Sequence, residues 1–384
     1  MVGLRVLPTV SSGTWIMVKI ALLFTSFLLT FGTGASAQSL EQVKKFRLEF
    51  IPNKMIYQWA QLTGDKAAKE FERSGTPRKE VFLYLNQIAD HPLNLAVVHA
   101  DLEKRQIDFQ RYSHGVTEHT PLFLYSITKS FVGLSTLSVV CEHNINLDDN
   151  LGKHSPRLKN TVYAGVSIRQ ALKMQSGVMK NKYFLDNLQV SIFKSLLQKQ
   201  QTPLETIEKL TSVEKPAGQS FEYSGYDTNA LLILIEDLTK KSFLDRFRKD
   251  YFENNGLGKP IYWMTTKNAE PAGMAGLTSS PLNVVRLADR YLDILTNNKC
   301  VSQLFAQGKL HDQSDGKYGF QVWYTGWTSK DRKDIFHMRG NGGQIISINI
   351  PAKTVTFVYS LAQKYGGLGE ISSALGKFER SVFP

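Results

Sequence analysis

The pattern of apolar and polar positions divides the chain into strand-like ends and a helical middle. Two β-rich runs, 95–99 and 106–112, flank a polar turn and predict a hairpin. Helical periodicity dominates from residue 126 to about 295 and predicts helices at 127–142, 167–175, 188–199, 204–211, 228–239, 243–251 and 281–295. Strand-like stretches return near the end, at 318–326, 333–340, 344–350 and 354–360. One more helix is predicted after them, at 370–378.

This order of elements predicts an α+β fold, with an antiparallel sheet built from both chain ends and flanked by helices. The expected sheet lobe comprises residues 91–125 and 305–384, and an all-helical lobe, residues 126–304, is inserted into it. Residues 38–90 are amphipathic and predict a helical N-terminal extension. A cleft between two such lobes is a natural position for an active site.

The first residues have the pattern of a secretory signal. A lysine precedes the mostly apolar run 20–31, and small residues follow at 35–37, after which cleavage is expected. The apolar run is too short to span a bilayer comfortably, although an uncleaved anchor is the alternative. We interpret residues 1–37 as a signal peptide whose translation starts at Met1 or Met17, and expect the mature chain to be periplasmic in a Gram-negative cell or secreted.

Composition limits the partners. The 384 residues are 42% hydrophobic and 21% charged, as in ordinary globular proteins, and the formal net charge is +12. Because the basic residues are scattered, we interpret them as a solvated basic surface and expect no nucleic-acid partner. Loose association with an anionic cell wall or membrane surface is the alternative.

The cysteines and histidines do not indicate a metal site. Cys141 and Cys300 could pair in an oxidising compartment, but Cys141 closes an apolar helix and is expected to be a small buried hydrophobe. Neither the two cysteines nor the eight histidines have the spacing of metal ligands. We therefore expect no metal and no cofactor.

One serine and lysine pair stands at the head of an apolar helix. Ser126 and Lys129 form an S-x-x-K, and the same spacing at 191–194, 212–215 and 314–317 lies among polar residues instead. Residues three apart share a helix face, so the Lys129 amine can reach the Ser126 oxygen. Burial among apolar side chains favours a neutral amine, which can take the serine proton. The alternative is an N-cap serine followed by a lysine that extends to solvent.

Two later stretches hold groups that such a nucleophile needs. Tyr223 begins a Tyr-Ser-Gly loop before a helix, where its hydroxyl could relay a proton to a leaving group. Otherwise it is a partly buried tyrosine at a turn. Asn341, Gly342 and Gly343 lie between two strand-like runs, where glycines let backbone N–H groups approach an oxyanion. Asn-Gly is also a strong hairpin signal by itself, so a plain turn is the alternative.

The order of these three motifs resembles the penicillin-recognising serine hydrolases of the class C β-lactamase type. That family has S-x-x-K, then Y-S/A-N, then a K/H-T/S-G-like triplet on a strand. The stretches "INLDDNLGKHSPRL", "VSIRQALKMQSGV" and "AGMAGLTSSPLNVVRLADRYLDIL" are also similar to the family, so the resemblance covers roughly residues 90–362. It is strongest to the 6-aminohexanoate-dimer hydrolases, and it implies a β-lactamase/transpeptidase-like fold.

The resemblance implies a role for each matching residue. Ser126 would be the acylated nucleophile, Lys129 its base or proton relay, and Tyr223 the second acid/base group. The backbone N–H groups of Ser126 and Gln344 would form the oxyanion hole. The expected substrate-binding residues are Tyr183, Asn341, Gly342 and Gly343.

Two departures from the family pattern change the expected substrate. Gly225 stands where the family has Asn, and Asn341 stands where it has Lys or His. The cation that meets a β-lactam or peptide carboxylate is therefore missing at that position. Arg339 would share a strand face with position 341 and could replace that cation, or it forms a salt bridge elsewhere. The departures favour an esterase or amidase.

We therefore expect a secreted serine hydrolase that cleaves an ester or amide in a small or short peptide-like substrate through an acyl-enzyme on Ser126. The second expectation is a penicillin-binding D-Ala-D-Ala carboxypeptidase or a β-lactamase. The third is a catalytically silent member of the family that binds the cell wall or a partner. No G-x-S-x-G motif occurs, so an α/β-hydrolase is not indicated.

Overall fold

The main sheet is formed by strands from both ends of the chain, as their apolar runs predict. A computed structural model describes residues 58–64, 70–75, 78–178, 201–211, 213, 215–253, 259–308, 317–324, 334–361 and 367–383. Eight of the described strands pair in the order β2-β4-β3-β12-β11-β10-β9-β8. Their bounds are Glu72–Arg73 for β2, Asn94–Asp101 for β3, Gln106–Tyr112 for β4, Tyr318–Gly319 for β8, Val322–Trp323 for β9, Ile335–Arg339 for β10, Ile345–Asn349 for β11 and Thr354–Ser360 for β12.

The centre of this sheet joins the two ends of the chain. β3 and β12 pair antiparallel from Asp101 opposite Thr354 to Ala96 opposite Tyr359. Nearly every residue of both strands is buried, because helices cover both faces of the sheet. β4 lies further out and buries only alternate residues, Ile107 and Phe109, as a strand with one covered face does.

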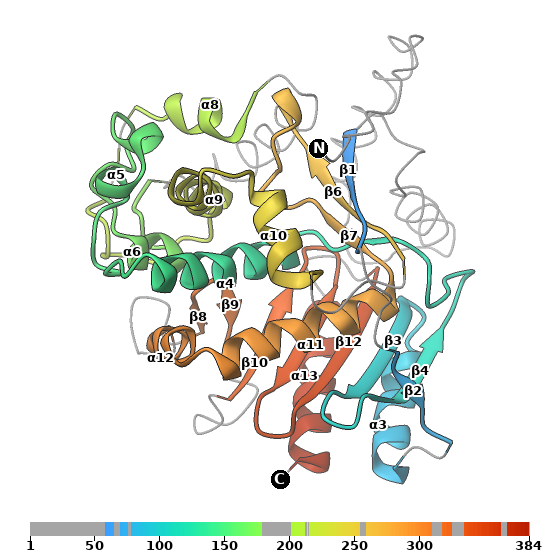
Figure 1. The fold of residues 1–384 in the computed structure, drawn as a ribbon. Coiled ribbons are helices and arrows are strands. Elements are labelled where there is room, and N and C mark those ends of the chain that lie inside the picture. The colour runs from blue at the N-terminus through green and yellow to red at the C-terminus, as the bar shows by residue number, and fades with distance from the viewer. Residues whose placement is uncertain are drawn as a thin grey trace, which may run out of the picture.

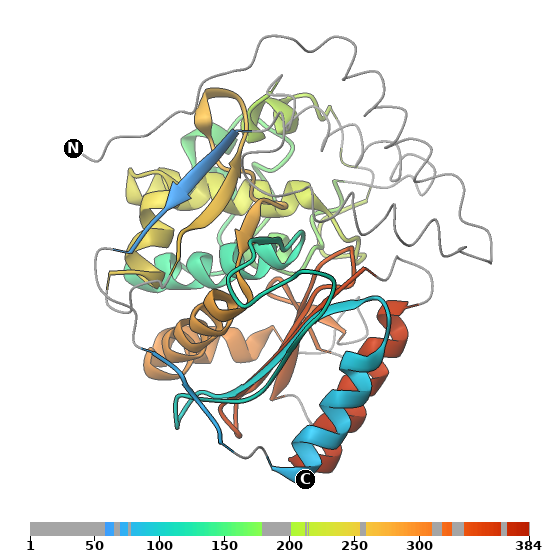
Figure 2. The same cartoon turned by 90° about the vertical axis from the view of Figure 1, so that its right-hand side faces the viewer.

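Helices form a layer on each face of the sheet (Figure 2). α3 and α13 lie side by side on one face and share an apolar cluster with the strands, whereas α11 covers the opposite face. Their bounds are Lys79–Asp90, Gly367–Val382 and Pro281–Asn297. The predicted C-terminal helix and the α+β class with an antiparallel sheet from both chain ends are confirmed.

The second lobe is built around two helices that pack against each other, α4 and α9 (Figure 1). Both are buried on nearly all sides, which is typical of helices at the centre of a protein. The helices of this lobe are α4 Ile127–Glu142, α5 Leu151–His154, α6 Ile168–Leu172, α8 Pro203–Glu208, α9 Gly225–Thr239 and α10 Phe243–Tyr251. None of the helices in the described ranges is long and apolar enough to cross a membrane.

The inserted lobe is not all-helical, which corrects the prediction. A four-stranded sheet, in the order β1-β6-β7-β5, lies beside its helices. The bounds are β1 Gln58–Leu62, β5 Leu122–Phe123, β6 Ile261–Thr265 and β7 Leu277–Ser279. β5 and β7 have only two and three residues, too few to show a period of two. β1 and β5 pair with strands that lie far away in the sequence.

Two other assignments differ from the sequence prediction. The N-terminal extension supplies strands β1 and β2 as well as helix α3, so its described part is not wholly helical. Helix α11 was assigned to the helical lobe but packs on the main sheet. The expected signal peptide at 1–37, the first part of the extension and the predicted helix 188–199 lie outside the described residues.

Cys141 and Cys300 form a disulfide bond, with an S–S distance of 2.03 Å and a Cα–Cα distance of 6.0 Å. The expectation that Cys141 is a small buried hydrophobe was therefore wrong. The last turn of α4 meets the first turn of α12, Lys299–Gln307, a helix that the apolar pattern did not predict. Only this packing brings two cysteines 159 positions apart within bonding distance.

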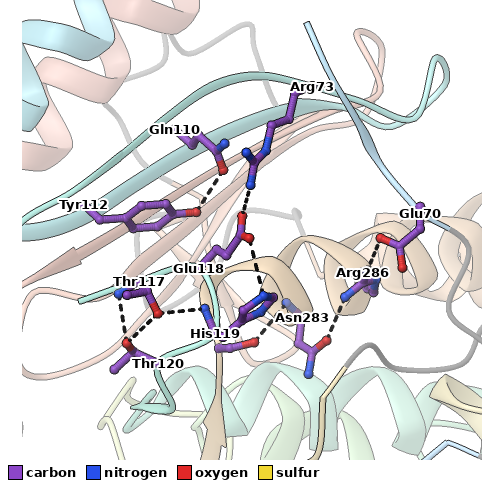
Figure 3. Close-up of polar contacts among 11 residues, drawn as sticks. Glu70, Arg73, Gln110, Tyr112, Thr117, Glu118, His119, Thr120, Asn283 and Arg286 are labelled. Carbon is purple, nitrogen blue, oxygen red and sulfur yellow. Dashed lines mark hydrogen bonds and ion pairs between the residues drawn. The ribbon is translucent and has the colours of Figure 1, made fainter. Parts of the chain in front are cut away.

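Ion pairs hold the N-terminal segment beside the edge of the main sheet (Figure 3). Arg73 of β2 donates to Glu118 at 2.6 Å, and Arg286 of α11 donates to Glu70 at 2.9 Å. A surface hollow of about 510 Å³ lies beside the first pair, lined by Arg73, Gln110, Arg111, Tyr112, Val116, Thr117 and Glu118. Both of its arginines already pair with carboxylates, so their charges are balanced within the protein.

Candidate active site

Ser126 stands between a strained turn and helix α4. Tyr125 has a φ of +50°, a left-handed conformation that is uncommon outside glycine. Thr128 closes the turn, because its hydroxyl donates to the Tyr125 carbonyl at 2.6 Å and accepts from the Leu277 N–H of β7 at 3.1 Å. The Leu124 N–H also donates to the Leu277 carbonyl, at 2.9 Å. These bonds fix the start of the helix, and with it Ser126.

The Ser126 hydroxyl faces Lys129. Ser126 occupies the N-cap of α4, but its side chain makes no capping hydrogen bond. Instead, the Lys129 amine donates to Ser126 Oγ at 3.1 Å. Lys129 is only 3% exposed and does not extend to solvent. The alternative interpretation, an N-cap serine followed by a solvent-exposed lysine, was therefore wrong.

The surroundings of Lys129 favour its neutral form. Burial lowers the pKa of Lys129 to about 7, and none of the described carboxylates counters this effect. The amine also donates to the Met274 carbonyl, and Nζ lies 5.2 Å from the centroid of the Tyr223 ring. At neutral pH a large fraction of such an amine is uncharged and can accept a proton.

Tyr223 shares a hydrogen bond with the Ser126 side chain. Burial raises the pKa of Tyr223 to about 12, and this effect outweighs the opposite effect of that bond. The phenol is therefore protonated at neutral pH and can donate its proton. Its ring centroid lies 5.5 Å from that of Trp323 and 5.6 Å from that of Tyr318. The structure thus brings Ser126, Lys129 and Tyr223 together.

The turn between β10 and β11 meets the nucleophile segment at Gly340. A Cβ on Gly340 would lie 2.7 Å from the Leu124 carbonyl oxygen and 2.6 Å from Gln344 Oε1, so a larger residue does not fit. Gln344 closes the turn, because its carbonyl accepts from the Gly340 N–H at 2.8 Å and its side chain accepts from the Gly342 N–H at 3.0 Å. The predicted cradle, Asn341 to Gly343, therefore directly follows a glycine that packs against Leu124, two residues before Ser126.

The individual binding roles in this turn stay predictions. Gly342 and Gly343 are buried, and Asn341 is exposed. No described contact joins Gln344 to Ser126, so the structure leaves its oxyanion role untested. Tyr183 lies outside the described residues. In the same described ranges, no three His, Cys, Asp or Glu side chains gather as metal ligands.

Arg339 ends β10 beside this turn. Its guanidinium carbon lies 5.6 Å from the centroid of Trp323, and Nη2 lies 3.5 Å from His337 Nδ1. Burial lowers the pKa of Arg339 to about 10, which leaves it cationic at neutral pH. Among the described residues, its Nε has no hydrogen-bond partner and no carboxylate pairs with the guanidinium. The salt bridge that was one expectation for Arg339 is not found among the described residues.

Sequence reasoning missed Gln321, which ties the elements around the site together. Its side chain accepts from Thr228 of α9 at 2.8 Å and donates to the Ala171 carbonyl of α6 at 3.2 Å. Its own carbonyl accepts from Ser130 of α4 at 2.7 Å. Gln321 and its neighbour Trp323 stand in a strand-like stretch, and nothing in that local pattern distinguishes them.

Comparison with known proteins identifies the family. Residues 85–372, well over half of the chain, match the family described as Beta-lactamase. The chain belongs to the β-lactamase family. The resemblance recognised from the three motifs is therefore confirmed, and the family of serine hydrolases agrees with the serine, lysine and tyrosine cluster described above.

Solved structures share this family's fold. A protein from Bacillus anthracis, provisionally named a 6-aminohexanoate-dimer hydrolase, superposes with a TM-score of 0.70 at 19% identity, covering 91% of this chain and 98% of that one. A penicillin-binding protein from Bacillus halodurans has a TM-score of 0.57 at 15% identity, with 79% and 99% covered. EstCE1, a hydrolase with promiscuous acyltransferase activity, has a TM-score of 0.58 at 14% identity, with 78% and 97% covered. At these identities the likeness shows the fold alone.

A curated relative matches a shorter stretch. Protein flp of Staphylococcus aureus (strain MRSA252) is 29% identical over 147 residues, which are 37% of this chain. The match spans 26% of the length of the staphylococcal protein. A match over so small a part of that protein does not carry its activity over to this chain.

Proposed function

We propose that this member of the β-lactamase family is a serine hydrolase that cleaves an ester or amide bond through an acyl-enzyme on Ser126. The observation that supports this most is the buried Lys129 amine 3.1 Å from Ser126 Oγ, with Tyr223 bonded to the same hydroxyl. Two groups able to move a proton therefore contact one hydroxyl. The start of helix α4 adds partial positive charge, which favours an alkoxide there.

Acylation uses the three side chains in turn. The neutral Lys129 amine takes the hydroxyl proton as Ser126 Oγ bonds to the carbonyl carbon of the substrate. Backbone N–H groups stabilise the charge on the carbonyl oxygen, and Ser126 and Gln344 are our candidates for them. Tyr223 gives its proton to the departing alcohol or amine as that bond breaks, and the Lys129 ammonium returns a proton to the phenol.

Deacylation reverses these roles. Water adds to the acyl carbon and loses a proton to the Tyr223 and Lys129 pair. Ser126 Oγ then leaves and takes the proton back, so the free acid and the unmodified enzyme result. Three partly exposed rings would offer an apolar wall to the substrate, those of Phe221, Tyr223 and Trp323. The Trp323 centroid lies 6.3 Å from that of Phe221 and 5.5 Å from that of Tyr223.

Labelling with a fluorophosphonate probe tests this function. We expect the wild-type protein to be labelled and Ser126→Ala to lose the label, because Ser126 is the proposed nucleophile. The matched control is Ser212→Ala, which removes the serine of another S-x-x-K and should be labelled like the wild type. An unlabelled wild type would favour the catalytically silent binding protein, and equal labelling of Ser126→Ala would show that Ser126 is not the nucleophile.

We also propose that the mature chain is exported. Two observations support this, the signal-like pattern of residues 1–37 and the disulfide between Cys141 and Cys300. Disulfides persist mainly in oxidising compartments such as the periplasm or the extracellular medium. The formal charge of +12 would favour loose contact with an anionic cell wall or membrane surface there.

Arg339 favours substrates that carry a carboxylate, and with them the second candidate, a penicillin-binding or carboxypeptidase activity. A partly buried cation that has no anionic partner among the described residues is unfavourable, so an anionic group of the substrate would complete this environment. Arg339 contacts Trp323, which in turn contacts Tyr223, so the guanidinium lies one aromatic ring away from the proposed proton donor.

Paired substrates test the role of Arg339. For Arg339→Gln we expect KM to rise roughly 10–100-fold for a carboxylate-bearing ester, the usual scale for a hydrogen bond to a charged group. The KM of the matched neutral ester should stay within about twofold. Arg339→Lys keeps the charge and should recover part of the loss. Equal losses on both esters would contradict a carboxylate site, and a stable fluorescent-penicillin adduct on Ser126 would support the second candidate.

A further inference from the structure

The segment that carries Tyr223 is bonded on both sides to one residue. The Glu222 N–H donates to the Met174 carbonyl at 2.9 Å, and the Ser224 N–H donates to the Met174 sulfur at 3.1 Å. Met174 is fully buried and has a φ of +58°, a left-handed conformation uncommon for methionine. The position of the Tyr223 backbone therefore depends on how the turn at Met174 is held.

Asp227 fastens that turn to helix α9. The Ser176 hydroxyl donates to Asp227 Oδ1 at 2.6 Å, and the Ser176 N–H bonds to the same carboxylate. The Tyr163 hydroxyl also donates to Oδ1, at 2.6 Å. Asp227 lies in the first turn of α9, directly after the Tyr223 loop. It thus links the two segments that meet at Met174.

The turn has little freedom to adopt another arrangement. Gly177 follows Ser176 with a φ of +71°, and a Cβ there would overlap the Lys215 carbonyl oxygen. The Gly218 N–H donates to the Gln175 carbonyl at 2.8 Å. The chain on both sides of Ser176 is therefore closely packed against the loop leading to Tyr223, and a change at Ser176 would be passed on to that loop.

Asp227 is an unusual residue for so buried a place. It is 0% exposed, and within the described ranges no cation pairs with it and Oδ2 has no hydrogen-bond partner. Burial raises the pKa of Asp227 to about 7, against the opposite effect of the bonds from Ser176 and Tyr163. A buried acid without a counter-charge is a poor choice for stability alone, because apolar residues of similar size often serve as well or better.

We propose that Asp227 is a positioning residue that holds Tyr223 against Ser126 through Ser176 and Met174. This inference rests on the proposed function, because it requires Tyr223 to act in proton transfer. The path runs from the Asp227 carboxylate to Ser176, along the turn to Met174, and from there to the backbone on both sides of Tyr223. Asp227 has no described contact with Ser126, so it acts through Tyr223 and not on the substrate.

A double-mutant cycle between Asp227 and Tyr223 tests the proposal, with kcat and KM measured on a neutral ester. We expect Asp227→Ala to lower kcat roughly 10–100-fold with little change in KM, since a small misplacement of a catalytic group has effects of this size. In the Tyr223→Phe background, the same substitution should change kcat by less than about twofold, because the hydroxyl to be positioned is gone. Asp227→Asn keeps an oxygen acceptor for Ser176 and should recover most of the activity.

Two further variants keep the test decisive. Ser176→Ala breaks the same link from the other side and should show the same dependence on the Tyr223 hydroxyl, even if Asp227→Ala fails to fold. Asp250→Ala is the matched control, because Asp250 is a buried carboxyl that pairs with Arg246 at 2.7 Å. Its loss should lower stability but leave the kcat of the folded enzyme unchanged in both backgrounds.

The outcomes separate this inference from the proposed function. If Asp227→Ala lowers kcat by the same factor with and without the Tyr223 hydroxyl, Asp227 supports the lobe in general and the inference is overturned. If Tyr223→Phe keeps full activity while Ser126→Ala has none, the inference fails but the serine hydrolase stands. If Ser126→Ala keeps full activity, the proposed function itself fails.

Discussion

Lys129→Ala is expected to lower the rate of Ser126 acylation by roughly 10²–10⁴-fold, the usual effect of removing a general base. The Lys129 amine is a basic group that donates a hydrogen bond to Ser126 Oγ at 3.1 Å. Without it, none of the described contacts gives this hydroxyl a basic group that can take its proton. The second-order rate of fluorophosphonate labelling measures the effect directly, because it reports acylation-like attack without deacylation.

The pH dependence gives this prediction an independent readout. Because the pKa of Lys129 is lowered to about 7, the amine becomes neutral as the pH rises through that value. The wild-type acylation rate should therefore rise with pH and level off above about 7, and this rise should be absent in the variant.

Two variants serve as controls for Lys129. Lys129→Met fills most of the same volume without an amine and should lose activity like Lys129→Ala. Lys153→Ala removes an exposed lysine that pairs with Asp149 at 2.8 Å and should label at the wild-type rate. If Lys129→Met acylates as fast as the wild type, the amine is not the base.

Removing the disulfide is expected to lower the free energy of unfolding by about 2–5 kcal/mol. The bond joins residues 159 positions apart, and cross-links that close long loops restrict the unfolded chain most. Urea unfolding of the Cys141→Ser/Cys300→Ser double variant, compared with the oxidised wild type, measures the difference.

The reduced wild type provides the matched comparison. Treatment with a reductant should lower the stability of the wild type by a similar amount and should not affect the double variant. Cys141 lies at the opposite end of α4 from Ser126, so the labelling rate of the folded double variant should stay close to that of the wild type. An unchanged free energy of unfolding would show that the bond does not stabilise the fold.

Long periodic segments were predictable because their signals are local. The nucleophile helix is found at Ile127–Glu142, as its mostly apolar run predicts, and the first hairpin is found at β3 and β4. Short strands such as β5 and β7 carry no such signal, because two or three residues cannot show a period. They form strands only because partners from distant parts of the chain lie beside them.

For the site, the order of motifs along the chain already determined which residues to consider, namely Ser126, Lys129 and Tyr223. Their chemical state depends on neighbours that are distant in sequence. The Lys129 amine donates to the Met274 carbonyl, and burial lowers the pKa of Lys129. Arg339 has no described carboxylate partner. Local patterns set the residue types and the helices, but burial, charge pairing and the disulfide arise only when distant segments pack, because solvent exclusion is a property of the folded whole.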